Sequence, residues 1–152
     1  MTARLLTAPL AAHVDQIALE RLPSEVIEKA KLCVLDALGC ALASAGHGAI
    51  KSLLGATRPR AIEPGAMGAS VWRAGLKTGA PTAALVNASM SHVVNADDAH
   101  KESMGHPGAV VIPAALVVGE MGIPGQGGLK MSEWTVEVEK CIRFQGYPAK
   151  MP

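Results

Sequence analysis

Apolar residues recur at every third or fourth position through the first third of the chain, which is the spacing of one helix face. Between Thr2 and Arg21 the spacing is approximate, and after Pro23 it becomes regular. Ser24 is a suitable N-cap for this second helix, and Gly46 is a suitable C-terminal stop. Its apolar positions are Val26, Ile27, Ala30, Cys33, Val34, Ala37, Leu38, Ala41 and Leu42. We therefore predict a helix over 2–21 and, most clearly, one from Ser24 to Gly46.

The next segment, residues 46–79, is rich in glycine and contains two prolines, which is typical of loops. Residues 49–56 are the exception, because they are mostly apolar or small and predict a short helix. Residues 70–72, Ser-Val-Trp, are compatible with a short extended piece.

Two apolar helices are predicted beyond this segment. The first covers 80–95, where Pro81 fits a first helical turn and no helix breaker follows. The second covers 109–120, and its regular part should begin about Pro113, because proline disrupts a helix interior. The predicted fold class is therefore all-α, mainly helical with long loops.

Composition changes near residue 122. Trp72 is the only aromatic residue before residue 131, whereas Trp134, Phe144 and Tyr147 follow close together. The change coincides with the sequence Gly-Ile-Pro-Gly-Gln-Gly-Gly at 122–128. We predict a helical domain over 1–121, a glycine-rich linker over 122–130 and an unrelated tail over 131–152. The tail's pattern fits either a strand or a helix.

The charge balance argues against several classes of partner. A net charge of +1 gives no electrostatic reason to expect nucleic acid or an anionic membrane. The longest uncharged run, residues 78–96, contains asparagine, serine and histidine and is too polar for a membrane span. No signal-peptide pattern is evident at the N-terminus. Three cysteines without a CxxC pair are typical of a reducing compartment, so we expect the cytoplasm.

Chemically reactive side chains gather in one polar segment between the two apolar helices. They are His92, Asp97, Asp98, His100 and His106. Histidine exchanges protons near neutral pH, and a neighbouring carboxylate can orient its ring, so the segment is a candidate for proton transfer. A solvated turn and a metal site are the alternatives. The spacing H-x4-D-D-x-H-x5-H matches no known zinc motif, so we predict neither metal nor cofactor.

Three blocks of sequence resemble the MmgE/PrpD family, whose members include 2-methylcitrate dehydratases, cis-aconitate decarboxylases and iminodisuccinate epimerases. The first is Leu-Pro-Ser-Glu-Val-Ile-Glu-Lys-Ala-Lys-Leu-Cys-Val-Leu-Asp-Ala-Leu-Gly at 22–39. The second runs from Ala-Ala-Leu-Val-Asn at 83–87 to His92, and the third covers 97–115 with its Asp-Asp pair and its His-Pro-Gly at 106–108. The resemblance covers about residues 5–121.

The resemblance implies a helical main domain, a separate lid domain, and metal-independent removal of a proton or carboxylate from a small polycarboxylate. It implies catalytic roles for His106, Asp97, Asp98 and His92. Asn95, His100 and Gly108 are the expected substrate-binding positions. Family members often carry an aspartate at the position of Asn95 and a threonine at that of Ala99, so this chain departs from the family there.

Family enzymes are considerably longer, and the resemblance stops just after Glu120. We therefore expect a truncated relative with an incomplete active site. Unpaired helix faces would favour a homo-oligomer. Two other readings remain open: a non-enzymatic helical interaction module or subunit completed by a partner chain, and a small enzyme whose site is completed by its tail or a second copy.

Overall fold

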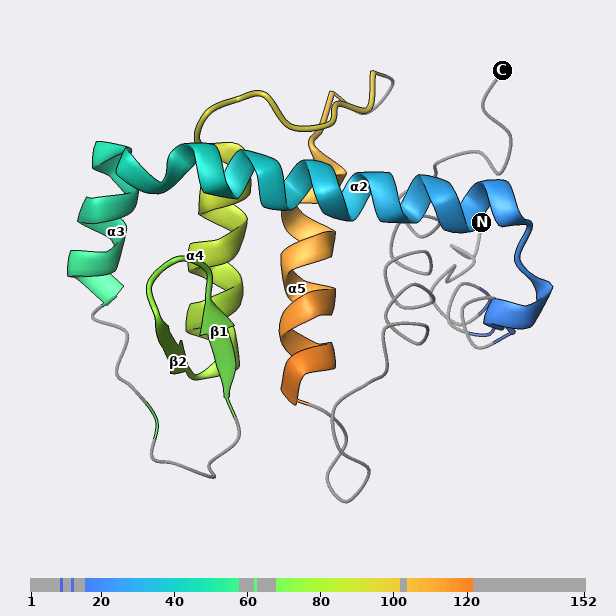
Figure 1. Cartoon of the computed structure of the whole chain (residues 1–152), viewed down its shortest axis with the longest axis horizontal. Coiled ribbons are helices and arrows are strands. Elements are labelled where there is room, and N and C mark those ends of the chain that lie inside the picture. Colours follow the sequence, from blue (N-terminus) through green and yellow to red (C-terminus); the bar gives the residue numbers. More distant parts are fainter. Residues whose placement is uncertain are drawn as a thin grey trace, which may run out of the picture.

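Figure 1 shows the computed structural model of the chain, which describes residues 16–57, 62, 68–101 and 104–121 together with positions 9 and 12. The predicted mainly helical fold is confirmed. The elements are η1 (Leu19–Arg21), α2 (Ser24–Ala43), η2 (Ser44–Gly46), α3 (Gly48–Thr57), β1 (Ala69–Val71), β2 (Leu76–Thr78), α4 (Ala80–His92) and α5 (Pro107–Met121).

The long helix α2 crosses α4 and α5, which stand side by side beneath it in Figure 1. The antiparallel hairpin β1–β2 packs against α4, and β1 also contacts α5. The short helix α3 follows the end of α2 and packs on α4. Most of the predicted helix over 2–21, the predicted linker over 122–130 and the predicted tail over 131–152 lie outside the described residues.

Small side chains form much of the seam between the helices. Ala30 and Ala37 of α2 pack with Ile112 and Leu116 of α5 in one buried cluster. A second cluster joins α2, α3, α4, α5 and β1 through Ala41, Ile50, Ala69, Val71, Ala83, Val86, Met90 and Val117. The buried Ser91 hydroxyl shares its proton between the Asn87 carbonyl oxygen of its own helix, at 3.1 Å, and the Ala37 carbonyl oxygen across the seam, at 3.2 Å. Alanine and serine let helix backbones approach closely, so these residues set the spacing of α2 from α4 and α5.

The hairpin is held by two polar side chains from the helices behind it. Asn87 of α4 accepts the Trp72 N–H at 2.9 Å and donates to the Ser70 carbonyl at 2.9 Å. Glu120 of α5 accepts the Ser70 N–H at 2.7 Å and the Ser70 hydroxyl at 2.6 Å, and it pairs with Lys77 at 2.8 Å. A two-stranded hairpin is marginal by itself, so these contacts stabilise it.

The ends of α2 differ from the prediction. Pro23 is the residue before the first helical turn, with an extended ψ of 142°, and no side chain caps the helix there. Ser24 is therefore the first helical residue, and its prediction as N-cap was wrong. The α-helix ends at Ala43, and η2 continues the coil to Gly46, the predicted stop.

Three further elements differ from the prediction. Helix α4 ends at His92 and not near residue 95. Helix α5 begins at Pro107, six residues before Pro113, which lies buried inside the helix. The prediction that its regular part begins about Pro113 was wrong, because a capping contact described below starts the helix earlier. Strand β2 was not predicted, since its three residues carry too short a pattern.

Among the described residues, no single helix has both the length and the apolarity of a membrane span. The segments Ser24–Gly46 and Gly48–Thr57 meet that composition test only when taken together, and they are bent by 89°.

Replacing Glu120 by glutamine should destabilise the protein by about 1–2 kcal/mol at neutral pH, because the charge-assisted bonds to Lys77 and Ser70 weaken. Burial raises the pKa of Glu120, but the hydrogen bonds from Lys77 and Ser70 outweigh it and hold that pKa below its ordinary value of 4.5. A lowered folded-state pKa stabilises the fold fully above the ordinary value, and this stabilisation is lost as pH falls through the folded-state pKa.

Urea unfolding of the wild type and of Glu120→Gln between pH 7 and pH 3 measures this difference. It should shrink steadily below pH 4.5. Glu20→Gln, at an exposed position, is the control and should match the wild type throughout. A constant gap between wild type and Glu120→Gln across the range would contradict the ionic origin of the effect.

Candidate functional site

The segment between α4 and α5 folds back on itself and brings both ends of the polar cluster together. The Asn95 N–H donates to the His92 carbonyl at 2.8 Å, and Asn95 has a φ of 51°, a left-handed conformation that asparagine tolerates well. His100 and Gly105 then pair through their backbones, with the His100 N–H donating at 2.8 Å. These two turns carry Asp97 into the space between His92 and His106.

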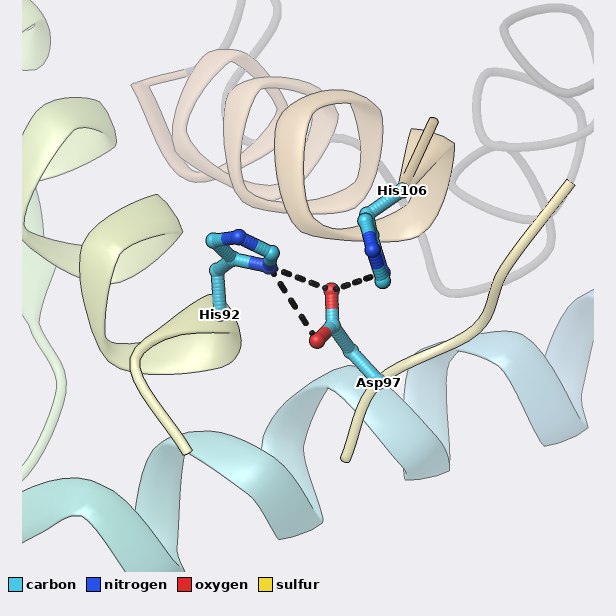
Figure 2. A group of neighbouring side chains, drawn as sticks. All are labelled: His92, Asp97 and His106. Atoms are coloured by element: carbon cyan, nitrogen blue, oxygen red, sulfur yellow. Dashed lines mark hydrogen bonds and ion pairs between the residues drawn. The ribbon is translucent and has the colours of Figure 1, made fainter. Parts of the chain in front are cut away.

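Asp97 is the centre of the site, as Figure 2 shows. Its side chain is 1 % exposed. The Nδ1 atom of His92 lies 3.0 Å from Oδ2 and 3.2 Å from Oδ1 of this carboxylate. The Nδ1 atom of His106 lies 3.3 Å from the same Oδ2. The two rings are 4.7 Å apart between centroids and tilted by 58°, so one buried carboxylate serves two histidines.

The two histidines are not held equally. His92 is within hydrogen-bond distance of Asp97 and its side chain is 50 % exposed. His106 is 32 % exposed, yet its Nδ1 atom is buried and makes no hydrogen bond within the described structure, although Asp97 Oδ2 is at ion-pair distance. The contact between His106 and Asp97 is therefore electrostatic, and its alignment is too poor for a hydrogen bond.

This arrangement fixes which ring nitrogen can exchange a proton. A carboxylate beside Nδ1 favours the tautomer with its proton on that atom, which leaves the Nε2 lone pair available. Because Asp97 faces Nδ1 of both rings, both Nε2 atoms lie on the sides away from the carboxylate. The cluster can therefore accept or donate a proton at an exposed ring edge.

Asp98 has a different position from its neighbour. Its Oδ1 atom accepts the Gly108 N–H at 3.0 Å, and Oδ2 lies 3.3 Å from the same nitrogen. Asp98 thus caps the first turn of α5, where Pro107 occupies the first helical position. This explains the early start of α5. It also fills the helix terminus with a protein carboxylate.

The predicted substrate-binding residues lie around this cluster. Asn95 is exposed at the turn after α4, and His100 is partly buried at the backbone bridge. Gly108 is buried against Asp98, and a Cβ atom there would collide with the Asp98 carboxylate. The structure brings His92, Asp97 and His106 together, while the binding roles of Asn95, His100 and Gly108 stay predictions.

Helix α2 passes close to the acidic pair, a proximity that sequence spacing did not suggest. Burial raises the pKa of the Cys40 thiol, and the charges of Asp36, Asp97 and Asp98 raise it further. Burial likewise raises the pKa of Cys33 against the opposing charge of Lys29. Cys33 and Cys40 both carry free thiols.

A separate open groove of about 760 Å³ lies between α2 and the hairpin. Its lining includes Leu38, Leu42, Trp72, Leu76 and Met90, with Arg73 and Lys77 as its cations. None of the residues of the histidine cluster line it. The cluster is the candidate site because it gathers two imidazoles and a carboxylate, whereas the groove offers mainly apolar surface.

Known proteins are similar to this chain over most of its length, including the segment that carries the histidine cluster. The model of the MmgE/PrpD N-terminal domain matches residues 8–126. A cis-aconitate decarboxylase of Aspergillus terreus (strain NIH 2624 / FGSC A1156) is 30 % identical over 144 residues, which are 94 % of this chain and 28 % of that enzyme. Another cis-aconitate decarboxylase of Aspergillus terreus is 29 % identical over the same coverage. No solved structure matches the chain significantly.

Gly108→Ala should destabilise the protein by about 1–3 kcal/mol, because the added methyl group displaces the Asp98 carboxylate from the first turn of α5. Gly39→Ala is the matched control. Gly39 lies inside α2 with open space around the position of a Cβ, so alanine should stabilise by about 0.5–1 kcal/mol. Chemical unfolding of the three proteins measures both changes. Similar stabilities for the two variants would show that the close approach at Gly108 has no energetic weight.

Proposed function

Because the chain belongs to the MmgE/PrpD family, we propose that His92, Asp97 and His106 form part of a site for lyase chemistry on a small polycarboxylate. The chain spans 28 % of the length of the curated relatives that it matches, both of them cis-aconitate decarboxylases. The observation that carries the proposal is the buried Asp97 carboxylate in contact with Nδ1 of two histidines. A tricarboxylate such as cis-aconitate is the substrate class that these relatives suggest.

Asp97 acts as a positioning residue in this proposal, and His106 is the group that exchanges the proton. The Asp97 carboxylate lies beside the Nδ1 atom of each ring, so in this proposal the Nε2 atom of His106 faces the substrate. In its neutral form Nε2 removes a proton from the carbon next to a substrate carboxylate. In a decarboxylation, which is a separate reaction without that first step, protonated Nε2 donates its proton to the carbanion left when the C–C bond breaks and carbon dioxide departs, and solvent then restores the proton to Nε2.

The substrate's own carboxylates need cations or N–H donors, and the described residues of the cluster provide acidic groups and imidazoles. Asp98 already takes the N–H of Gly108 at the start of α5. We propose that further polypeptide completes the site, either from the same protein or from a partner chain. The family often has aspartate and threonine at the positions of Asn95 and Ala99. Because asparagine and alanine side chains do not exchange protons, the histidine cluster carries the proton transfer in this proposal.

A second candidate function, a helical interaction module or subunit, is favoured by apolar side chains on outer helix faces. Leu35 of α2 is 67 % exposed and Val118 of α5 is 64 % exposed. Further exposed apolar side chains are Leu32, Leu42, Leu85 and Val110. Monomeric proteins rarely leave large apolar patches in water, so we propose that these faces contact another copy of the chain.

Deuterium exchange followed by NMR tests the proposed chemistry. The purified protein is incubated in heavy water with cis-aconitate, citrate, methylcitrate or an aspartate-like dicarboxylate. We expect exchange next to a carboxylate for at least one substrate, and about a 100-fold loss in His106→Gln, since a positioned proton-transfer group typically contributes that much or more. Asp97→Asn should lower the rate as well, because it removes the charge that orients both rings.

The control variant is His47→Gln, which changes an exposed histidine outside the cluster. It should exchange at the wild-type rate. Exchange no faster than in buffer for every substrate, or equal rates in the wild type and His106→Gln, would contradict a catalytic role for the cluster. Circular dichroism of each variant separates loss of chemistry from loss of fold.

Light scattering coupled to size-exclusion chromatography tests the self-association. We expect the wild type to form a dimer or larger oligomer, and Leu35→Gln with Val118→Gln to shift it toward monomer, because both substitutions place an amide at the proposed contact. Lys51→Gln on α3 is the control and should leave the size unchanged. A well-folded wild-type monomer at all concentrations would contradict the proposed self-association.

A further inference from the structure

The histidine cluster contains the donor atoms of a metal site. One ring nitrogen of His92, one of His106 and a carboxylate oxygen of Asp97 all lie within 4.8 Å of one another, and Nδ1 is the atom of each ring that contacts Asp97. Two imidazoles and one carboxylate suit borderline cations such as Zn²⁺, Co²⁺ or Fe²⁺. They suit Mg²⁺ and Ca²⁺ poorly, because those ions prefer oxygen ligands. This donor set is formed by residues 92, 97 and 106, whose spacing along the chain matches no zinc motif.

The distances within the cluster fit ligands around one ion. Metal–ligand bonds of about 2.0–2.1 Å place neighbouring ligand atoms of a tetrahedron roughly 3.3 Å apart. The Asp97 oxygen lies 3.0 Å from His92 Nδ1 and 3.3 Å from His106 Nδ1. The widest separation in the group is no more than 4.8 Å, and the half-exposed His92 ring can rotate to reduce it.

Two features of burial favour a cation at this position. The Nδ1 atom of His106 is buried without a hydrogen bond inside the described structure, so its bonding capacity is unused. The Asp97 side chain is 1 % exposed, and a buried carboxylate needs a compensating positive charge. A divalent ion between these groups satisfies both. The neighbouring Asp98 carboxylate remains at the Gly108 N–H and stays outside the donor set.

We propose that His92, Asp97 and His106 bind a single zinc-type transition-metal cation through both Nδ1 atoms and one carboxylate oxygen. Three protein ligands leave one coordination position for water or an anion. When a metal occupies Nδ1, the remaining proton of each neutral ring resides on Nε2. The ion therefore removes the proton acceptor on which the proposed function depends, so metal binding and proton transfer exclude each other. The metal site itself does not rest on the proposed function.

Calorimetric titration of chelator-treated, tag-free protein with Zn²⁺ tests the site. We expect one ion per chain, with binding at least about tenfold weaker in His92→Gln and in His106→Gln. The matched control, His47→Gln, should bind like the wild type, because its exposed ring lies outside the cluster. The visible ligand-field spectrum with Co²⁺ should show four- or five-coordinate metal in the wild type and weaken in both cluster variants.

NMR of the ring nitrogens provides a readout in the unmutated protein. Adding Zn²⁺ should shift the Nδ1 resonances of His92 and His106 and leave those of His47 in place. Absence of saturable binding, wild-type affinity in both cluster variants, or unshifted resonances of His92 and His106 would each overturn the metal site.

The exchange assay separates this inference from the proposed function. Exchange in chelator-treated protein that Zn²⁺ inhibits supports both. Zinc bound at the cluster in a protein without exchange supports the metal site and contradicts the function. Exchange that saturating Zn²⁺ leaves unchanged overturns the inference and leaves the function standing.

Discussion

The hydrogen bond from the Gly108 N–H to the Asp98 carboxylate decides where α5 begins, and the geometry of the histidine cluster depends on that start. Helix N-termini carry N–H groups without helical partners and a partial positive charge, so a carboxylate placed there is stabilising. Here the carboxylate comes from ten residues earlier in the chain. It fixes His106, the residue before the first turn, relative to the segment that carries Asp97.

Two adjacent aspartates therefore perform different tasks. Asp98 is bound to the helix terminus, while Asp97 lies between two imidazoles. This division of tasks has a chemical consequence, because a carboxylate that is needed to start a helix cannot also turn toward a ligand. Gly108 makes the capping by Asp98 possible, since any side chain at position 108 would occupy the space of the Asp98 carboxylate.

Sequence periodicity was sufficient to predict α2, α3 and α4 and the mainly helical fold class. It failed at the start of α5, where proline at 113 suggested a boundary but a distant carboxylate set the true one. It also missed β2, whose Lys77 pairs with Glu120 of α5 and whose partner strand β1 is bonded to Asn87 of α4. The density of histidine and aspartate marked a segment in which His92, Asp97 and His106 come together in the fold. Which aspartate faces the histidines could not be read from the sequence, because two identical neighbours differ only in their three-dimensional partners.

The seam of small residues between α2 and α4 has a consequence for how this site can change. His92 follows Ser91, whose hydroxyl is bonded to the Ala37 carbonyl of α2, and α2 also passes close to the acidic pair. The spacing of His92 from Asp97 therefore depends on the alanines that let α2 and α4 pack closely. Replacing one of these alanines by a larger residue would push the helices apart and move His92 relative to Asp97 by a fraction of an ångström. Directed evolution of such a domain has a tuning position in the core of its helices, one layer below the histidine cluster.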